Sequence, residues 1–139
     1  MQFYSTNRKT SPVSLREAVV RGLAADRGLF MPEVIRRFPP AFYQNMKEMT
    51  LREISFVVAE AFFGEDVEAG KLKEIVDETL NFDIPLVQVA DNRYSLELFH
   101  GPTLAFKDVG ARFMARLLAY FNKQEGERQV NVLVATSGD

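Results

Sequence analysis

Cysteine is absent from this sequence of 139 residues, and histidine occurs only once, as His100. The lack of cysteine excludes disulfides, thiolate catalysis and Cys-ligated zinc or iron–sulfur clusters. One histidine cannot supply a multi-histidine metal site, so we expect no bound metal. No apolar run approaches the roughly 20 residues of a membrane-spanning helix, and the N-terminus contains no apolar core of a signal peptide. These absences predict a soluble, cytoplasmic protein.

An excess of charge of one sign is also missing. Lysine and arginine number 17 against 19 aspartates and glutamates, which gives a net charge of -2 without any basic block. Binding to nucleic acid or to an anionic membrane therefore has no electrostatic support. Hydrophobic residues make up 47% of the chain, a share typical of a folded globular protein. The length suits one moderate core with a small appendage.

The first part of the chain has the pattern of a helical unit. Two capping-box sequences, Ser14–Glu17 and Thr50–Glu53, each place a hydroxyl three residues before a glutamate at the start of an expected helix. Both helices lead to a glycine, and a third helix with apolar residues at helical spacing ends near Asn81. Residues 24–40, which are rich in proline and glycine, predict an irregular segment.

The pattern changes at Pro85. The β-prone runs 86–89 and 94–99, separated by a four-residue turn, predict a β-hairpin. A long helix is expected from about residue 103 to 122, and a buried strand over residues 130–135.

A strand, a helix and a strand at this spacing predict a βαβ crossover in a parallel sheet. We therefore expect an α/β fold in which a helical unit is followed by a β-hairpin and a βαβ crossover. The predicted domains are a mainly helical domain, residues 1–84, and the start of an α/β domain, residues 85–139.

Lys107 lies in the first turn of the long predicted helix and does not follow its amphipathic pattern. On a helical projection it points roughly 120° away from the centre of the polar arc, among apolar residues. Gly110 and Ala111, its neighbours three and four residues later, are small and leave room for a flat ring. The polar arc contains Asp108, Arg112, Ala115, Arg116, Ala119, Asn122 and Lys123; the apolar side contains Phe106, Val109, Gly110, Phe113, Met114, Leu117, Leu118 and Phe121.

A lysine in this position suits covalent chemistry with an aldehyde. Burial and the positive end of the helix dipole both disfavour the ammonium, and only the neutral amine forms a Schiff base. In the alternative interpretation, the stem of Lys107 lies along the helix and its ammonium reaches solvent. The helical projection leaves both interpretations open.

The sequence contains three further candidate site segments. Thr136–Asp139 follows the predicted strand 130–135, where open α/β sheets bind ligands, although turns use the same residue types. Glu97 and His100 are candidates for polar walls of a site. Alternatively, Glu97 is the solvent-facing residue of an alternating strand and His100 forms local hydrogen bonds, since no partner is visible to make it a base.

The segment FHGPTLAFKDVGARFMARLL, from Phe99 to Leu118, resembles the threonine synthase family of pyridoxal-phosphate enzymes, whose fold is similar to that of the tryptophan synthase β-subunit. Three other segments agree in the same order along the chain. Residues 3–8 resemble the N-terminal strand of the family, residues 14–32 resemble its S-x-x-E-A…G-L-F-x-P stretch, and residues 134–139 resemble the start of its T-S-G-D-T-G loop.

The resemblance implies a cofactor, a substrate and roles for five residues. Lys107 would hold pyridoxal 5′-phosphate covalently and later move protons between substrate carbons. Ser137, Gly138 and Asp139 would bind the cofactor, and Thr136 and Ser137 the substrate. The implied reaction converts O-phospho-L-homoserine and water into L-threonine and phosphate, the last step of threonine biosynthesis, on an incomplete part of the fold-type II architecture.

The sequence departs from the family pattern in two ways. Ala25-Asp26-Arg27-Gly28 stands where the family often has Pro-Asp-Gly-Gly, a loop change that we expect to be neutral. The phosphate-binding loop and most of the large second domain of the family lie downstream of the position that matches Asp139. The resemblance thus implies an N-terminal portion, and we expect the 139-residue chain to have little or no activity by itself.

Two other interpretations remain. Amino-acid dehydratases and cysteine-synthase-like enzymes share the fold group, but they usually carry Ser-Phe-Lys-Asp-Arg-Gly where this chain has Ala-Phe-Lys-Asp-Val-Gly, residues 105–110. The chain could also be a non-catalytic assembly module, because the exposed sheet edge of a partial layer invites pairing with a second copy.

Overall fold

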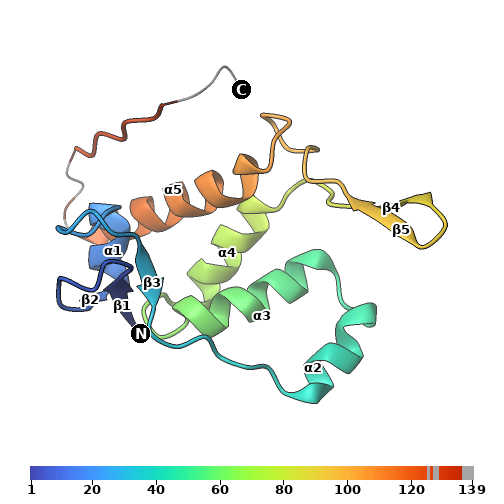
Figure 1. Cartoon of the computed structure of the whole chain (residues 1–139), viewed down its shortest axis with the longest axis horizontal. Coiled ribbons are helices and arrows are strands. Elements are labelled where there is room, and N and C mark those ends of the chain that lie inside the picture. The colour runs from blue at the N-terminus through green and yellow to red at the C-terminus, as the bar shows by residue number, and fades with distance from the viewer. Residues whose placement is uncertain (125, 127–128, 136–139) are drawn as a thin grey trace. The chain divides into compact units, whose positions relative to one another are not determined.

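The computed structural model describes residues 1–124, 126 and 129–135, and the chain divides into two compact units, Met1–Asp77 and Glu78–Asp139 (Figure 1). The first unit contains β1 (Gln2–Ser5), β2 (Val13–Ser14), α1 (Leu15–Arg21), β3 (Phe30–Pro32), α2 (Pro40–Asn45), the 3-10 helix η1 (Met46–Glu48), α3 (Leu51–Phe63) and most of α4 (Ala69–Thr79). The second unit contains the end of α4, then β4 (Leu86–Ala90), β5 (Arg93–Leu96) and α5 (Lys107–Gln124). The predicted domain boundary after residue 84 stays a prediction.

A small antiparallel sheet with the strand order β2-β1-β3 opens the first unit. Within β1, Phe3 and Ser5 are both buried, which is the alternation expected when one face of a strand is covered. The resemblance implied β1, but residues 24–40 were predicted to be irregular, and this is wrong at β3. The three residues of β3 pair with β1 across more than 20 positions of sequence, and local patterns do not show such pairing.

The three predicted helices of the first part are confirmed as α1, α3 and α4. The Ser14 hydroxyl accepts a hydrogen bond from the Glu17 amide at the start of α1. At α3, Thr50 and Glu53 form both bonds of the capping box, so two helix-end amides are satisfied. The buried hydrophobic residues of this unit, which form its core, are Phe3, Leu15, Ala18, Ala24, Ala59, Val67, Leu72, Ile75 and Val76.

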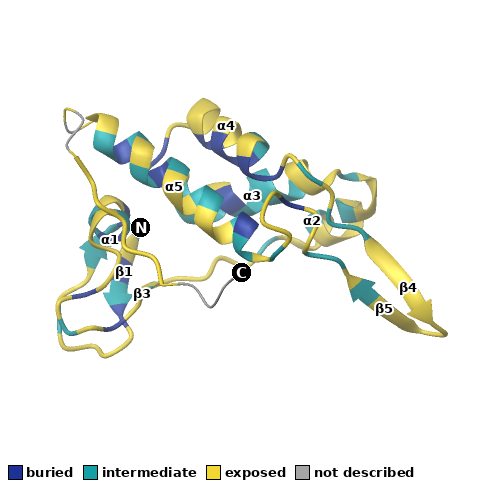
Figure 2. Cartoon of the chain, turned by 90° about the horizontal axis from the view of Figure 1, so that it is seen from above, coloured by how far each residue is buried: buried dark blue, intermediate teal, exposed yellow. Residues whose placement is uncertain are grey.

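The second unit begins with the predicted hairpin, which is confirmed as the antiparallel pair β4 and β5. The pairing runs from Leu86 opposite Leu96 to Ala90 opposite Arg93, and Asn92 adopts a positive φ in the turn. All five residues of β4 are exposed (Figure 2). A two-stranded hairpin that covers no core has little stability of its own.

The helix α5 begins at Lys107, four residues later than predicted, because residues 101–106 form turns instead. Leu117 and Phe121 are its buried hydrophobic residues. Among the helices in the described part of the chain, none is long and apolar enough to cross a membrane.

The predicted strand over residues 130–135 is not present in this structure. These residues have no regular secondary structure and are exposed, and both sheets of the described ranges are antiparallel. The predicted parallel sheet and βαβ crossover are therefore not present among the described residues, and they stay predictions. A parallel strand needs a neighbour that pairs with its backbone, and no described strand pairs with residues 130–135. The coarser prediction, a mixed α/β chain, is confirmed.

Candidate functional site

Lys107 is the first residue of α5, directly after the turns of residues 101–106. It is half-buried, whereas Gly110, one turn later on the helix, is exposed. A side chain added at Gly110 would meet nothing within 4 Å outside the helix backbone and its chain neighbours. The prediction that Lys107 lies in the first turn of a helix, beside small and open surface, is thus confirmed.

The two predicted faces of α5 are correct only in the C-terminal half of the helix. Leu117 and Phe121 are each 3% exposed, as the apolar side requires. Near the start of α5, however, Phe106 and Met114 are exposed at 62% and 46%, although they belong to the predicted apolar side. Asp108, placed on the polar arc by the projection, is only 3% exposed. The prediction of a uniform amphipathic pattern is wrong in the N-terminal half of α5 and at the residue before it.

The burial of Asp108 has a local cause in the preceding loop. Its Oδ2 atom accepts a hydrogen bond from the Thr103 amide at 2.9 Å and another from the Thr103 hydroxyl at 3.0 Å. A carboxylate in the first turn of a helix also interacts favourably with the positive end of the helix dipole. The charge is therefore compensated although the side chain is withdrawn from water.

Gly101 completes this loop because no larger residue fits. A Cβ atom at position 101 would lie 2.4 Å from Oδ2 of Asp108 and 2.8 Å from its Cβ and Cγ atoms. The carbonyl oxygen of Gly101 accepts the amide of Leu104 at 3.0 Å, and Leu104 has a positive φ of 57°. Residues 101–108 thus form a closed turn around the Asp108 carboxylate, and Lys107 lies within this turn. We name this turn, with Gly101, Thr103 and Asp108 as its members, the Asp108 turn.

Arg112 and Arg116 extend the polar contacts of α5 inside the second unit. Arg112 donates to the carbonyl oxygen of Glu78 and to Oδ1 of Asn81, and its guanidinium lies 5.6 Å from the ring centroid of Phe82. Arg116 forms an ion pair with Glu78 at 2.8 Å. Both arginines are half-buried, so this part of the predicted polar arc faces protein as well as water.

The candidates Glu97 and His100 lie in the chain segment that precedes Lys107, and the structure pairs them with each other. Nε2 of His100 lies 2.6 Å from Oε2 of Glu97, and the ring of His100 stacks on Phe99 with centroids 4.8 Å apart. The local hydrogen bond expected for His100 in the alternative interpretation is thus present.

The candidates Thr136, Ser137, Gly138 and Asp139 lie outside the described residues. The roles of these four residues in binding cofactor and substrate therefore stay predictions. Within the described ranges, no group of three or more histidine, aspartate or glutamate side chains is arranged to hold a metal ion.

The sequence patterns did not assign Gly101, Thr103 and Asp108 to the site. The signal that was available is the Gly-x-Thr spacing shortly before Lys107-Asp108. A glycine, a hydroxyl residue and a carboxylate so close together are typical of a tight turn held by side-chain bonds. The helical projection did not reveal this signal because it assigned Asp108 to the polar arc that faces water.

Comparison with known proteins agrees with this arrangement of a small mixed α/β chain that carries a lysine at a helix start. The family described as "Threonine synthase N terminus" matches residues 2–80, more than half of the chain. The chain therefore belongs to the threonine synthase family.

Individual relatives extend the likeness over the whole chain. Threonine synthase of Serratia marcescens is 40% identical over all 139 residues, which cover 32% of that protein. The structure of pyridoxal-phosphate-bound threonine synthase from Brucella melitensis superposes with a TM-score of 0.86 and 34% identity, over 92% of this chain and 29% of its own. That of the Escherichia coli enzyme gives 0.81 and 36%, over 87% of this chain and 28% of its own. The chain spans about a third of the length of the curated relatives it matches.

Proposed function

We propose that this chain is the amino-terminal part of a threonine synthase and supplies the lysine that binds pyridoxal 5′-phosphate. The complete enzyme would convert O-phospho-L-homoserine and water into L-threonine and phosphate. The observation that carries the proposal is the place of Lys107, half-buried at the first residue of α5 and next to the Asp108 turn. The family membership and the relative solved with bound pyridoxal phosphate support it.

The residues at Lys107 fit an aldehyde-bearing cofactor. The side-chain amine of lysine is the group that reacts with such an aldehyde, and the surface above Gly110 is open enough for a flat ring. Pyridoxal phosphate, when bound, supplies an electron sink for negative charge on substrate carbons. Lys107 would hold the cofactor and would later take up and return a proton. Thr136, Ser137, Gly138 and Asp139 would contact the cofactor and the substrate.

The fold of the complete enzyme is part of the proposal. We propose that residues 130–135 become a strand only where further strands of a parallel fold-type II sheet lie beside them. Their composition, with valines at alternate positions and a leucine between them, suits a strand buried on both faces. The predicted cytoplasmic location also stays a proposal.

A chimaeric enzyme tests the catalytic proposal. The 139-residue chain is joined to the remaining two thirds of the Serratia marcescens threonine synthase, and release of phosphate from O-phospho-L-homoserine is measured. We expect activity in the chimaera and a loss of ~10³-fold or more in Lys107→Ala, because no other group would replace this amine. Lys123→Ala, an exposed lysine of the same helix, serves as the control and should retain activity. An active Lys107→Ala chimaera would contradict the proposal.

The isolated chain should show little or no phosphate release, because one amine can capture an aldehyde but cannot orient the whole cofactor. Turnover by the pure 139-residue chain would refute this part of the proposal.

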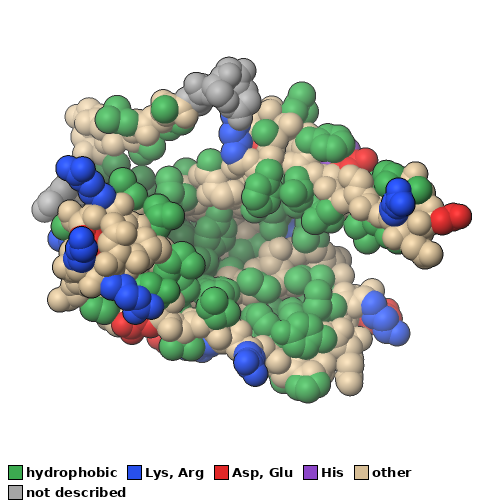
Figure 3. Space-filling view, in the orientation of Figure 1, with side chains coloured by type: hydrophobic (Ala, Val, Ile, Leu, Met, Phe, Trp, Pro, Cys, Tyr) green, Lys and Arg blue, Asp and Glu red, His purple; other side chains and the backbone are tan. Residues whose placement is uncertain are grey.

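A second candidate, a non-catalytic assembly module, is favoured by the exposed apolar residues of the second unit. Hydrophobic side chains lie at the surface in Figure 3, and those of the hairpin are Leu86, Val87, Val89, Tyr94 and Leu96. Such a surface favours self-association of the isolated chain. Gel filtration over a range of concentrations tests it, and a Leu86→Lys, Leu96→Lys double variant should shift any oligomer towards monomer.

A further inference from the structure

Asp108 is a buried carboxylate next to a half-buried lysine, and the proposed function gives it no role. Withdrawing a carboxylate from water is costly unless hydrogen bonds compensate. Here both described bonds to Oδ2 come from Thr103, five residues earlier. The carboxylate therefore stabilises one local shape of the chain, the turn that leads into α5.

The turn is closely packed as well as hydrogen-bonded. The approach of Asp108 to Gly101 leaves no space for a Cβ atom, and Leu104 adopts a left-handed backbone conformation that costs energy in a residue other than glycine. The turn therefore keeps one specific backbone geometry, although a more open turn would avoid the close contact at Gly101 and the unfavourable φ of Leu104.

The consequence for Lys107 follows from helix geometry. Consecutive residues of a helix leave the axis about 100° apart, so a carboxylate held inward at position 108 fixes the direction in which the side chain at position 107 leaves the helix. The first turn of a helix otherwise frays readily, since its amides lack partners within the helix. The Asp108 and Val109 amides instead bond to the carbonyl oxygens of Ala105 and Phe106.

We propose that Asp108 is a positioning residue for Lys107, which it orients through the Asp108 turn. The inference rests on the proposed function, in which Lys107 captures pyridoxal phosphate. It adds that the hydrogen bonds from Thr103 to Asp108 determine how fast this one lysine reacts compared with the other lysines of the chain.

The experiment compares the reactivity of two lysines of the same helix in the folded 139-residue chain. The chain is incubated with pyridoxal phosphate and cyanoborohydride, and peptide mapping gives the rates of modification at Lys107 and at the exposed Lys123. Acetic anhydride at low dose gives the same ratio without any cofactor. The ratio is internal, so a loss of protein during the experiment does not change it.

The test variants are chosen to change the hydrogen bonds with as little change of shape as the side chains allow. Thr103→Val removes the hydroxyl donor and Thr103→Ser restores it, whereas Asp108→Asn keeps the shape of the side chain without its charge. The matched control is Asp26→Asn, which alters the equivalent carboxylate of a turn in the first unit. Thermal melting followed by circular dichroism establishes that each variant is folded.

We expect the Lys107 to Lys123 ratio to fall on the order of tenfold in Thr103→Val, to recover in Thr103→Ser and to stay unchanged in Asp26→Asn. If Asp108→Asn fails to fold, the two Thr103 variants decide. The proposed function is refuted separately, by a Lys107→Ala chimaera that keeps its activity. A wild-type preference that persists in Thr103→Val and in folded Asp108→Asn would refute the positioning role alone.

Discussion

Two turns of this molecule, one in each unit, are built in the same way and differ in what they hold together. In the first unit, Oδ1 of Asp26 accepts the Ser5 hydroxyl at 2.6 Å and the Gly28 amide at 3.0 Å, and Oδ2 accepts the Lys9 amide at 3.0 Å. A Cβ atom at Gly28 would lie 2.0 Å from Oγ of Ser5. Each turn thus combines an aspartate, a hydroxyl donor and a glycine without room for a side chain.

The difference lies in the sequence distance that each aspartate bridges. Asp26 joins segments 17 to 21 residues apart and connects β1 with the loop before β3, whereas Asp108 bonds only five residues back. Loss of the first turn should therefore weaken the fold of the first unit. Loss of the second should mainly change the local geometry next to Lys107. The same set of residues can thus serve stability in one place and, as we propose, function in the other.

The largest effect on stability is expected from Gly28→Ala. The new Cβ would clash with Oγ of Ser5, which is fully buried, and with the backbone nitrogen of Asn7 at 2.9 Å. Oγ of Ser5 donates to Asp26 and accepts the amide of Asn7, so neither atom can move without breaking these bonds. We therefore expect a loss of about 2–3 kcal/mol in the free energy of unfolding. Urea unfolding followed by circular dichroism measures it.

The control for this substitution is Gly110→Ala. This glycine lies in α5 with open space around it, so alanine should leave stability unchanged or raise it by about 0.5–1 kcal/mol. Equal losses in both variants would show that close packing at Gly28 is not the cause.

Gly101→Ala should have a smaller effect on stability and a larger one on the site. Its Cβ would overlap the Asp108 side chain, but the turn is local and can open without disturbing the core. We expect a loss of about 1–2 kcal/mol, together with a lower Lys107 to Lys123 labelling ratio. An unchanged labelling ratio in a destabilised Gly101→Ala variant would show that the Asp108 turn does not orient Lys107.

Local sequence patterns were sufficient to predict several elements of this structure. The helices α1, α3 and α4 and the β4–β5 hairpin follow from local patterns, because caps such as Thr50 with Glu53 and alternation in Tyr94 and Leu96 act over a few residues. The helical spacing also placed Lys107 in the first turn of a helix, although that helix begins four residues later than predicted.

The remaining features depend on contacts that local patterns do not contain. The pairing of β3 with β1 is such a case, and so is the burial of Asp108, which the helical projection assigned to solvent. Residues 130–135 show the reverse situation, since their composition predicts a strand, while the described chain contains no strand that pairs with them. A strand depends on its neighbours, and a sequence pattern indicates only that a segment is able to pair.

Asp26→Asn should change the acid limb of stability. The hydrogen bond from the Ser5 hydroxyl is the main cause that lowers the pKa of Asp26, with further bonds from the Gly28 and Lys9 amides. A lowered pKa in the folded state contributes stability above the ordinary pKa of aspartate, and this contribution is lost as pH falls through the folded value. Urea midpoints between neutral and acidic pH should fall less steeply in Asp26→Asn than in the wild type. Parallel curves would contradict this assignment.

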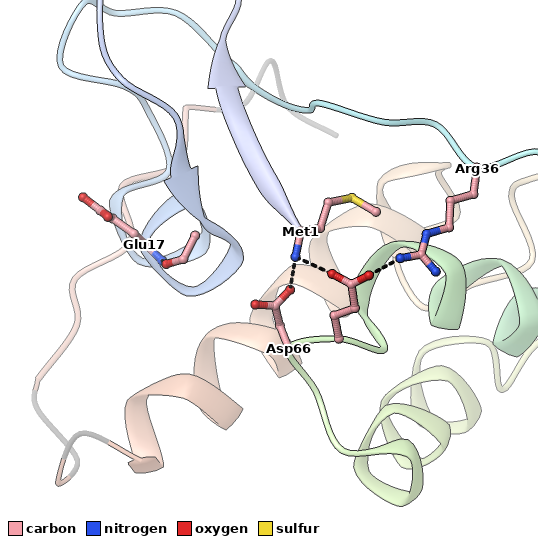
Figure 4. A network of polar contacts seen from close by, with 6 residues as sticks. Met1, Glu17, Arg36 and Asp66 are labelled. Atoms are coloured by element: carbon pink, nitrogen blue, oxygen red, sulfur yellow. Dashed lines mark hydrogen bonds and ion pairs between the residues drawn. The ribbon is translucent and has the colours of Figure 1, made fainter.

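The smallest effect is expected at the N-terminus, where the chain of ion pairs shown in Figure 4 lies within the first unit. The amine of Met1 donates to Glu65 at 2.9 Å and to Asp66 at 3.2 Å, and Arg36 forms an ion pair with Glu65. The bonds to Glu65 and then to Asp66 raise the pKa of the amine, and the amine is in turn the main cause that lowers the pKa of Glu65.

Acetylation of the amine, which removes its charge, should therefore lower the melting temperature slightly at neutral pH, and less at high salt. The sign of the pH dependence is fixed by the raised pKa: the contribution is complete below the ordinary pKa of an N-terminal amine and is lost as pH rises through the folded value. The acetylated and free chains should thus converge in melting temperature in alkaline solution. The ion pair between Met1 and Glu65 spans 64 positions of sequence but lies at the surface. We expect its exposure, more than its sequence distance, to decide its strength. A loss of stability as large as that of Gly28→Ala would contradict this expectation.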